Sequence, residues 1–168
     1  MNVKMIRIAL LIAIASILFA LESLVPSPLP WMRLGLANII TILALRWWGM
    51  KEAFSIVILR VLLGSLLTGK FLHPVFLLSM SGGIIGALSM GLSLKITGEV
   101  FSLIGISIIG SFFKNITQLI VSYLIYVRHF QLFSLLPLFL LSSLVGGAVI
   151  GILAHFINSR LKLAGVVV

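Results

Sequence analysis

The residues most capable of chemistry in this sequence are cations and amides that lie inside long apolar runs. Arg60 lies near the middle of one run, and Lys114, Asn115 and Gln118 lie near the middle of another. Lys114 and Gln118 are four residues apart, so a helix places both on one face. A cation at the bilayer centre costs about 3 kcal/mol, so such a side chain normally faces an interior cavity or a partner. The pattern therefore predicts a polar site inside a membrane protein.

A carboxylate and a second amide are expected at a similar depth. Glu22 lies near the end of the first apolar run, and Asn38 lies near the start of the second. Together, the polar groups predict one pocket that opens outward. We expect its substrate-binding residues to be Glu22, Arg33, Asn38, Arg60, Lys114, Asn115 and Gln118.

The charges of these residues indicate which ligand the pocket would take. One carboxylate, Glu22, cannot neutralise both Arg60 and Lys114, so a positive surplus remains. That surplus favours a carboxylate or phosphate group held by charge-assisted hydrogen bonds. The alternative is an internal ion pair between Glu22 and one cation, which would serve only stability or folding specificity. A proton relay is less favoured, because Glu22 is the only acidic residue near the path.

The elements that must position these residues are membrane-spanning helices. The 168 residues are 61% hydrophobic and only 9% charged, whereas soluble domains carry about 25% charged residues. The apolar runs reach the length of about 20 residues that crosses a bilayer. We expect an all-α, single-domain bundle over residues 1–168, with six transmembrane helices at about 5–24, 33–48, 52–68, 74–95, 100–127 and 134–157.

The charges of the loops predict the orientation of this bundle. If the N-terminus is inside, seven of the flanking cations are cytoplasmic and three are external, which agrees with the positive-inside rule. We therefore expect both termini in the cytoplasm, a first helix that is retained, and a location in a bacterial cytoplasmic membrane. The net charge of +9 then reflects orientation and not nucleic-acid binding. The cytoplasmic set is Lys4, Arg7, Arg46, Lys51, Lys95, Arg160 and Lys162, and the external set is Arg33, Lys70 and Arg128.

The composition also excludes several kinds of enzyme. There is no cysteine and no aspartate, and Glu22, Glu52 and Glu99 are far apart in the sequence. Disulfides, thiol catalysis and clustered metal ligands are therefore not expected. The sequence contains no Gly-rich nucleotide-binding motif of the Gly-x-x-x-x-Gly-Lys type, so energy for transport would have to come from a partner or a gradient. We expect no catalytic residue, no metal and no cofactor.

A proline-rich segment separates the first two predicted helices. The alternating Pro26, Pro28 and Pro30 forbid a helix and favour a stiff, extended loop. We expect this loop, with Trp31, to cap the pocket as a gate. Lys70 and His73, in the connection between the third and fourth helices, would lie at the rim of the pocket and complete the gate.

Pairs of small residues predict where helices approach closely. Gly82 and Gly86 in the fourth helix, and Gly147 and Gly151 in the sixth, suggest packing within the bundle. The segments 74–79 and 137–142 are also alike, and shared packing rules explain this better than an internal repeat. Ala9 and Ala13 form a similar pair in the first helix, for which packing and partner docking are equally open.

Two resemblances extend this interpretation. Residues 4–7, followed by Ala9 and Ala13, resemble the first helix of the substrate-binding S components of energy-coupling factor vitamin transporters. In that group such an alanine pair docks on the transmembrane coupling subunit. Residues 21–28, 33–39 and 113–118 resemble the Gx transporter family, also called heptaprenyl diphosphate synthase component I. That family usually has glycine at the position of Trp31 and histidine at the position of Lys114, so ligand preference could differ here.

The residues and the resemblance together predict a substrate-binding membrane protein similar to an S component. It would capture a small, anionic, partly apolar molecule, such as a vitamin or an isoprenoid or quinone precursor. Its partners would be a coupling subunit and ATPases of the energy-coupling factor type. The alternatives are a non-catalytic membrane subunit of a prenyl diphosphate synthase or of an extracellular electron-transfer system, and a stand-alone secondary transporter. Prenyl synthases use aspartates to hold metal-bound diphosphate, so this chain is not expected to be such a catalyst.

Overall fold

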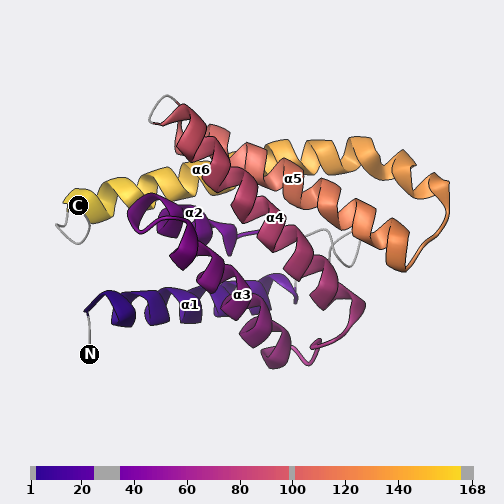
Figure 1. Ribbon diagram of the computed structural model, residues 1–168, viewed down its shortest axis with the longest axis horizontal. Helices are drawn as coiled ribbons and strands as arrows, with labels where there is room; N and C mark the ends of the chain where they lie inside the picture. The colour runs from indigo at the N-terminus through magenta and orange to yellow at the C-terminus, as the bar shows by residue number, and fades with distance from the viewer. Residues whose placement is uncertain (1–2, 25–34, 99–100, 164–168) are drawn as a thin grey trace.

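The helical class predicted from the sequence is confirmed in a computed structural model of the protein, which describes residues 3–24, 35–98 and 101–163 (Figure 1). These residues form six α-helices and one 3-10 helix, and no strand occurs among them. The helices are α1 (Val3–Glu22), α2 (Asn38–Trp47), α3 (Met50–Leu67), α4 (Pro74–Thr97), α5 (Leu103–Ile125) and α6 (Leu136–Leu163), with η1 (Phe130–Leu135) before α6.

Four stretches of helix are long and apolar enough to cross a membrane, namely α1, α4, α5 and the run of η1 and α6. The fifth long helix, α3, has 18 residues, but it is not one of these four stretches. It carries three charged residues, Lys51, Glu52 and Arg60. The remaining helix, α2, has 10 residues, which gives about 15 Å at 1.5 Å per residue, or half of a hydrocarbon core of about 30 Å. The expectation of six spanning helices is therefore supported in part.

The short helix α2 lies inside the bundle. All of its residues from Asn38 to Leu45 are buried, and Arg46 is the first exposed one. The helix was expected to begin at residue 33, but within the described residues it begins at Asn38, after the left-handed Gly35 (φ +83°). Because α2 is surrounded by other helices, its polar side chains can only face interior space or neighbouring helices.

The boundaries of the other helices follow from local sequence. Gly49 precedes α3 with a left-handed φ of +95°, which favours glycine. Pro74 occupies the first turn of α4, where a missing backbone N–H costs nothing. Ser102 caps α5 by accepting a hydrogen bond from the Gly105 N–H at 3.3 Å.

The most extensive helix contacts in the bundle are those of α5, with α4 on one side and α6 on the other (Figure 1). Gly147 and Gly151 of α6 lie directly against the backbone of α5. A Cβ at these glycines would be 2.7 Å from the Cα of Ile108 and 2.4 Å from that of Ile104, respectively. On α4, a Cβ at Gly86 would be 3.2 Å from the Gly110 carbonyl oxygen. Both glycine pairs therefore pack within the bundle, as predicted.

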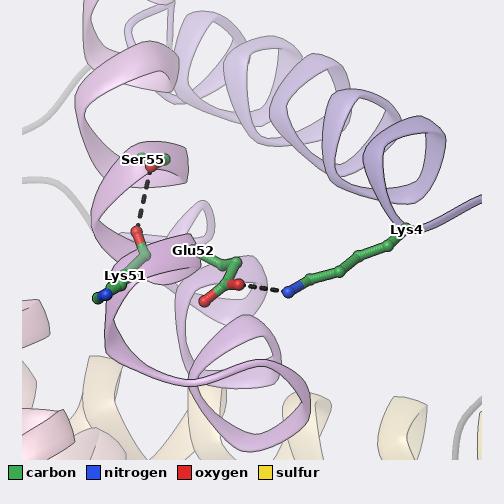
Figure 2. A network of polar contacts seen from close by, with 4 residues as sticks. All are labelled: Lys4, Lys51, Glu52 and Ser55. Atoms are coloured by element: carbon green, nitrogen blue, oxygen red, sulfur yellow. Dashed lines mark hydrogen bonds and ion pairs between the residues drawn. The ribbon is translucent and has the colours of Figure 1, made fainter. Parts of the chain in front are cut away.

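One end of the bundle holds both ends of the described chain, and we call it the terminal end (Figure 1). Here Lys4 of α1 forms an ion pair with Glu52 of α3, while Lys51 points away from that carboxylate (Figure 2). The indole Nε1 of Trp47 donates to the Asn158 Oδ1 at 2.9 Å and ties α2 to α6. Lys4 and Lys51, two of the predicted cytoplasmic cations, therefore lie at the same end of the bundle.

Candidate functional site

A small polar cavity lies among α1, α2, α3, α4 and α5, in the half of the bundle away from the terminal end. Its volume is about 30 Å³. Since one buried water needs at least about 10–15 Å³, the cavity has room for about two. The lining residues are Phe19, Glu22, Gly35, Ala37, Asn38, Arg60, Val61, Ser79, Gly83, Lys114 and Gln118.

Arg60 reaches this cavity from the middle of α3. The residue is 4% exposed, and its Nη2 donates a hydrogen bond to the Asn38 Oδ1 at 2.5 Å. Its Nε has no hydrogen-bond partner among the described residues. The guanidinium lies beside α4 at Gly83, where a Cβ would be 3.9 Å from Nη2. The absence of a side chain at Gly83 thus helps to make room for the cation.

Lys114 enters the same cavity from α5 and is 8% exposed. Its ammonium lies against Gly35, where a Cβ would be 2.8 Å from Nζ and 2.9 Å from the Asn38 Nδ2. The stem of the lysine lies against Gly86, where a Cβ would be 3.2 Å from the Lys114 Cβ. Two glycines from different segments therefore accommodate this side chain.

Glu22 provides the carboxylate of the cavity. It is 8% exposed, and its Oε1 accepts a hydrogen bond from the Leu36 N–H at 2.5 Å. This bond joins the end of α1 to the residues just before α2. Among the described residues, Glu22 thus hydrogen-bonds to a backbone N–H and Arg60 to a side-chain amide, which are both neutral groups.

Gln118 completes the polar lining from one turn beyond Lys114. Its Nε2 donates to the Leu78 carbonyl oxygen at 3.3 Å, whereas its Oε1 has no hydrogen-bond partner among the described residues. Gly82 makes room for it, because a Cβ there would be 2.8 Å from the Gln118 Cγ. The Arg60 Nε and the Gln118 Oε1 are buried groups that a water or ligand could satisfy.

The lining therefore carries two cations, one carboxylate and two amides. Among the described lining residues the formal charge is +1, from Arg60 and Lys114 against Glu22. In a low-dielectric interior such a surplus is costly unless an anion offsets it. The arrangement can hold one anionic group between two cations, with Asn38 and Gln118 placed to add hydrogen bonds.

One predicted substrate-binding residue, Asn115, faces a neighbouring helix and not the cavity. The amide of Asn115 faces α6, where its Nδ2 lies 3.3 Å from the Phe139 carbonyl oxygen, 3.0 Å from the Ser142 Oγ and 2.9 Å from the Ser143 Oγ. It is not among the residues that line the cavity. Because successive residues of a helix are turned by about 100°, Asn115 and Lys114 face different neighbours.

Of the residues that were predicted to form the gate, the structure describes Lys70 and His73. The Lys70 Nζ donates to the Ser23 carbonyl oxygen at 3.4 Å, which ties the α3–α4 connection to the end of α1. His73 is exposed, and its Nδ1 accepts a hydrogen bond from the Val75 N–H. Neither lines the cavity. The other predicted gating residues, Pro26, Pro28, Pro30 and Trp31, lie outside the described residues, as does Arg33, which was predicted to bind the substrate.

Sequence reasoning missed the small and apolar part of the lining. Gly35 and Ala37 come shortly before Asn38 in the sequence, and Gly83 follows Gly82, a glycine that was predicted to serve helix packing. In the sequence, these positions could be recognised only as small residues near a polar one. The same pattern is common in ordinary helix packing. No group of three potential metal ligands occurs within the described ranges, so nothing in them indicates a metal site.

Comparison with known proteins identifies the family. The family described as heptaprenyl diphosphate synthase component I matches residues 11–157, which is most of the chain. The chain therefore belongs to this family, as the resemblance of its motifs indicated. No curated protein matches it. No solved structure matches it either.

Proposed function

We propose that this member of the heptaprenyl diphosphate synthase component I family is a non-catalytic membrane protein that captures a small anion for uptake. The observation that carries the proposal is the shared cavity of Arg60 and Lys114, which holds two buried cations and one carboxylate, Glu22. Buried cations of this kind in a membrane protein usually mark a ligand or ion pathway.

The size of the cavity limits which part of the ligand it can hold. A volume of about 30 Å³ accepts a charged group in place of water, but not a whole vitamin-sized molecule. The apolar remainder would extend past Glu22 and Gly35, the two described lining residues on either side of segment 25–34.

Transport would require a partner or an ion gradient, because the sequence has no nucleotide-binding motif of its own. Ala9 and Ala13 support a docking role on α1, since both are exposed, unlike the glycine pairs of α4 and α6. Small residues on an exposed helix face allow the close backbone approach that associates helices in lipid. We propose that this face meets a coupling subunit driven by ATPases, with the termini in the cytoplasm.

The test is affinity purification of the full chain from its native membrane, followed by identification of the retained proteins. The wild-type chain is expected to retain a membrane coupling subunit and ATPases, and the Ala9→Leu/Ala13→Leu variant is expected to lose them. The matched control is Leu10→Ala, which changes an exposed residue of α1 beside the pair. Unchanged retention in the double variant would contradict the docking role.

A second function is favoured by the family name, which denotes a component of a synthase. In this alternative the chain is a non-catalytic membrane subunit of a prenyl diphosphate synthase. The absence of aspartate agrees with a non-catalytic role, since the catalytic partner would supply the metal-binding carboxylates. The same purification separates the two functions, because recovery of a synthase in place of ATPases would favour the second.

A further inference from the structure

The cavity lined by Arg60 and Lys114, which we call the Arg60 cavity, contains an acceptor that lacks a donor. The Gln118 Nε2 donates to the Leu78 carbonyl oxygen at 3.3 Å. A carbonyl can only accept, so the amide cannot be reversed without losing this bond. The Gln118 Oε1 therefore lies on the other side of the amide. It is buried and has no hydrogen-bond partner among the described residues.

The guanidinium of Arg60 brings an unsatisfied donor to the same lining. Its Nη2 donates to the Asn38 Oδ1, whereas its Nε–H is buried without a partner among the described residues. Since the Asn38 Oδ1 accepts from Arg60, the Asn38 Nδ2 lies on the other side of that amide. It is found beside Gly35, where an added Cβ would be 2.9 Å from it and 2.8 Å from the Lys114 Nζ.

An ionised carboxylate alone would satisfy only half of these groups. Its oxygens accept hydrogen bonds and cannot donate them, so they would pair with Arg60 and with the donors beside Gly35. They would leave the Gln118 Oε1 without a donor. Glu22 also lines the cavity and adds a second set of acceptor oxygens. Because a buried acceptor without a partner is costly, a ligand that only accepts fits this lining poorly.

Any ligand that enters the cavity must also compete with water. A water molecule both donates and accepts, so it can satisfy the Arg60 Nε–H and the Gln118 Oε1. The cavity of about 30 Å³ has room for about two such molecules. A group that displaces ordered water without reproducing its hydrogen bonds loses affinity. The lining therefore selects for a ligand group in which an acceptor and a donor are adjacent.

We propose that the anion captured in the Arg60 cavity is a monoanion with an O–H donor beside its charged group, as in an α-hydroxycarboxylate. This inference rests on the function proposed above. The charged oxygens pair with Arg60, and the hydroxyl donates to the Gln118 Oε1, which makes Gln118 a specificity-determining residue. The described lining residues carry a formal charge of +1. A monoanion offsets this charge, whereas a zwitterion with an ammonium donor would leave it in place.

The test compares lactate, propionate and alanine, which differ only in the group beside the carboxylate: a hydroxyl, a hydrogen or an ammonium. Binding of each to the full chain in nanodiscs of phosphatidylcholine is measured by ligand-observed NMR titration. Lactate is expected to bind about tenfold more tightly than propionate, because only lactate provides a donor for the buried acceptor. It is also expected to bind more tightly than alanine, which does not offset the positive charge.

A variant assigns the preference to Gln118. Gln118→Met keeps a long unbranched side chain but removes the Oε1, so it should bind lactate and propionate equally. The matched control is Asn115→Leu, which removes the other buried amide of α5 and does not change the lining of the cavity. It should keep the preference of the wild type. The comparison on the wild-type chain does not depend on whether either variant folds.

The outcomes separate this inference from the proposed function. If propionate binds the wild type as tightly as lactate, the hydroxyl donor is overturned, while the anion site of the proposed function stands. Tightest binding of alanine would overturn the monoanion. A preference for lactate that persists in Gln118→Met would overturn the role of Gln118. If none of the three compounds binds, the proposed function and this inference fail together.

Discussion

Two buried cations from different helices, Arg60 and Lys114, line one cavity in this protein. Arg60 hydrogen-bonds to Asn38, and the Lys114 ammonium lies against Gly35, three residues before Asn38. Like charges at such a place repel each other, and their burial is costly. An anion between them would offset both costs, which is why we propose that this cavity binds a ligand and does not serve stability alone.

Gly35 provides a test of how the lysine is positioned. Gly35→Ala would place a methyl group 2.8 Å from the Lys114 Nζ in a left-handed backbone conformation. We expect a loss of stability of about 1–2 kcal/mol from the backbone alone, together with weaker retention of the co-purified anion. Thermal unfolding and native mass spectrometry measure the two effects.

Gly69→Ala is the matched control, because Gly69 has a similar φ of +64° but nothing within 4 Å of an added Cβ. It should lose stability to a similar extent and retain the anion. Equal retention of the anion in the two variants would show that the contact of Gly35 with Lys114 does not matter for binding.

Replacing Asn115 tests whether this buried amide of α5 serves helix packing or ligand binding. Asn115→Leu removes the hydrogen bonds to α6, so we expect a loss of about 1 kcal/mol in stability. Ligand retention should not change, because Asn115 does not line the cavity. A variant that stays fully stable yet loses the ligand would reverse this assignment.

For single residues, the sequence could predict which buried positions are polar and which of them share a helix face. It could not predict which neighbouring helix each side chain meets. The spacing of Lys114 and Gln118 correctly placed both on one face, and both line the cavity. The positions of Arg60 and Asn38 at similar depth were also informative, because the two side chains meet. The contact of Asn115 with α6 could not be predicted, because depth alone does not say which neighbouring helix a side chain meets.

At the scale of the helices, glycines set how closely α6 approaches α5. Gly151→Ala would place a Cβ 2.4 Å from the Cα of Ile104, which is backbone that cannot rotate away. We expect the helices to separate at a cost of about 1–3 kcal/mol, as in other overpacked sites. Thermal unfolding of the purified chain in detergent measures this loss.

Val149→Ala provides the control on the same helix. Val149 is 42% exposed, so its truncation should change stability little. If Gly151→Ala were as stable as the wild type, the close approach of α5 and α6 would not be needed for the fold.

Helix positions were predictable where the sequence carries a local stop signal. Pro74 correctly marked the start of α4, whereas α3 begins at Met50, directly after Gly49 and two residues before the predicted start. The end of α6 was placed too early, because Arg160 and Lys162 were assigned to a tail, whereas the helix continues to Leu163. A helix can continue through basic residues beyond its apolar segment, so the end of the apolar segment does not mark the end of the helix.

At the scale of the whole molecule, the central question is which side of the membrane each end faces. The chain has no cysteine, so a single cysteine can be introduced and labelled. The exposed residues Lys51 and Gln131 lie at the terminal end and in η1 at the opposite end, respectively. In intact cells, Gln131→Cys should react with an impermeant maleimide, and Lys51→Cys should react only after permeabilisation. The reverse pattern would turn the Arg60 cavity toward the cytoplasm and contradict capture from outside.

The most direct measurement is native mass spectrometry of the full chain, gently purified from its own membrane. The wild-type protein is expected to carry a small anionic molecule, and Arg60→Gln and Lys114→Gln are each expected to lose at least about nine-tenths of it, since a lost charge-assisted bond costs about tenfold in affinity. Lys51→Gln should retain it, because Lys51 does not line the cavity. A wild-type chain without any anionic ligand, or variants that retain it in full, would contradict the assignment of this cavity to ligand binding.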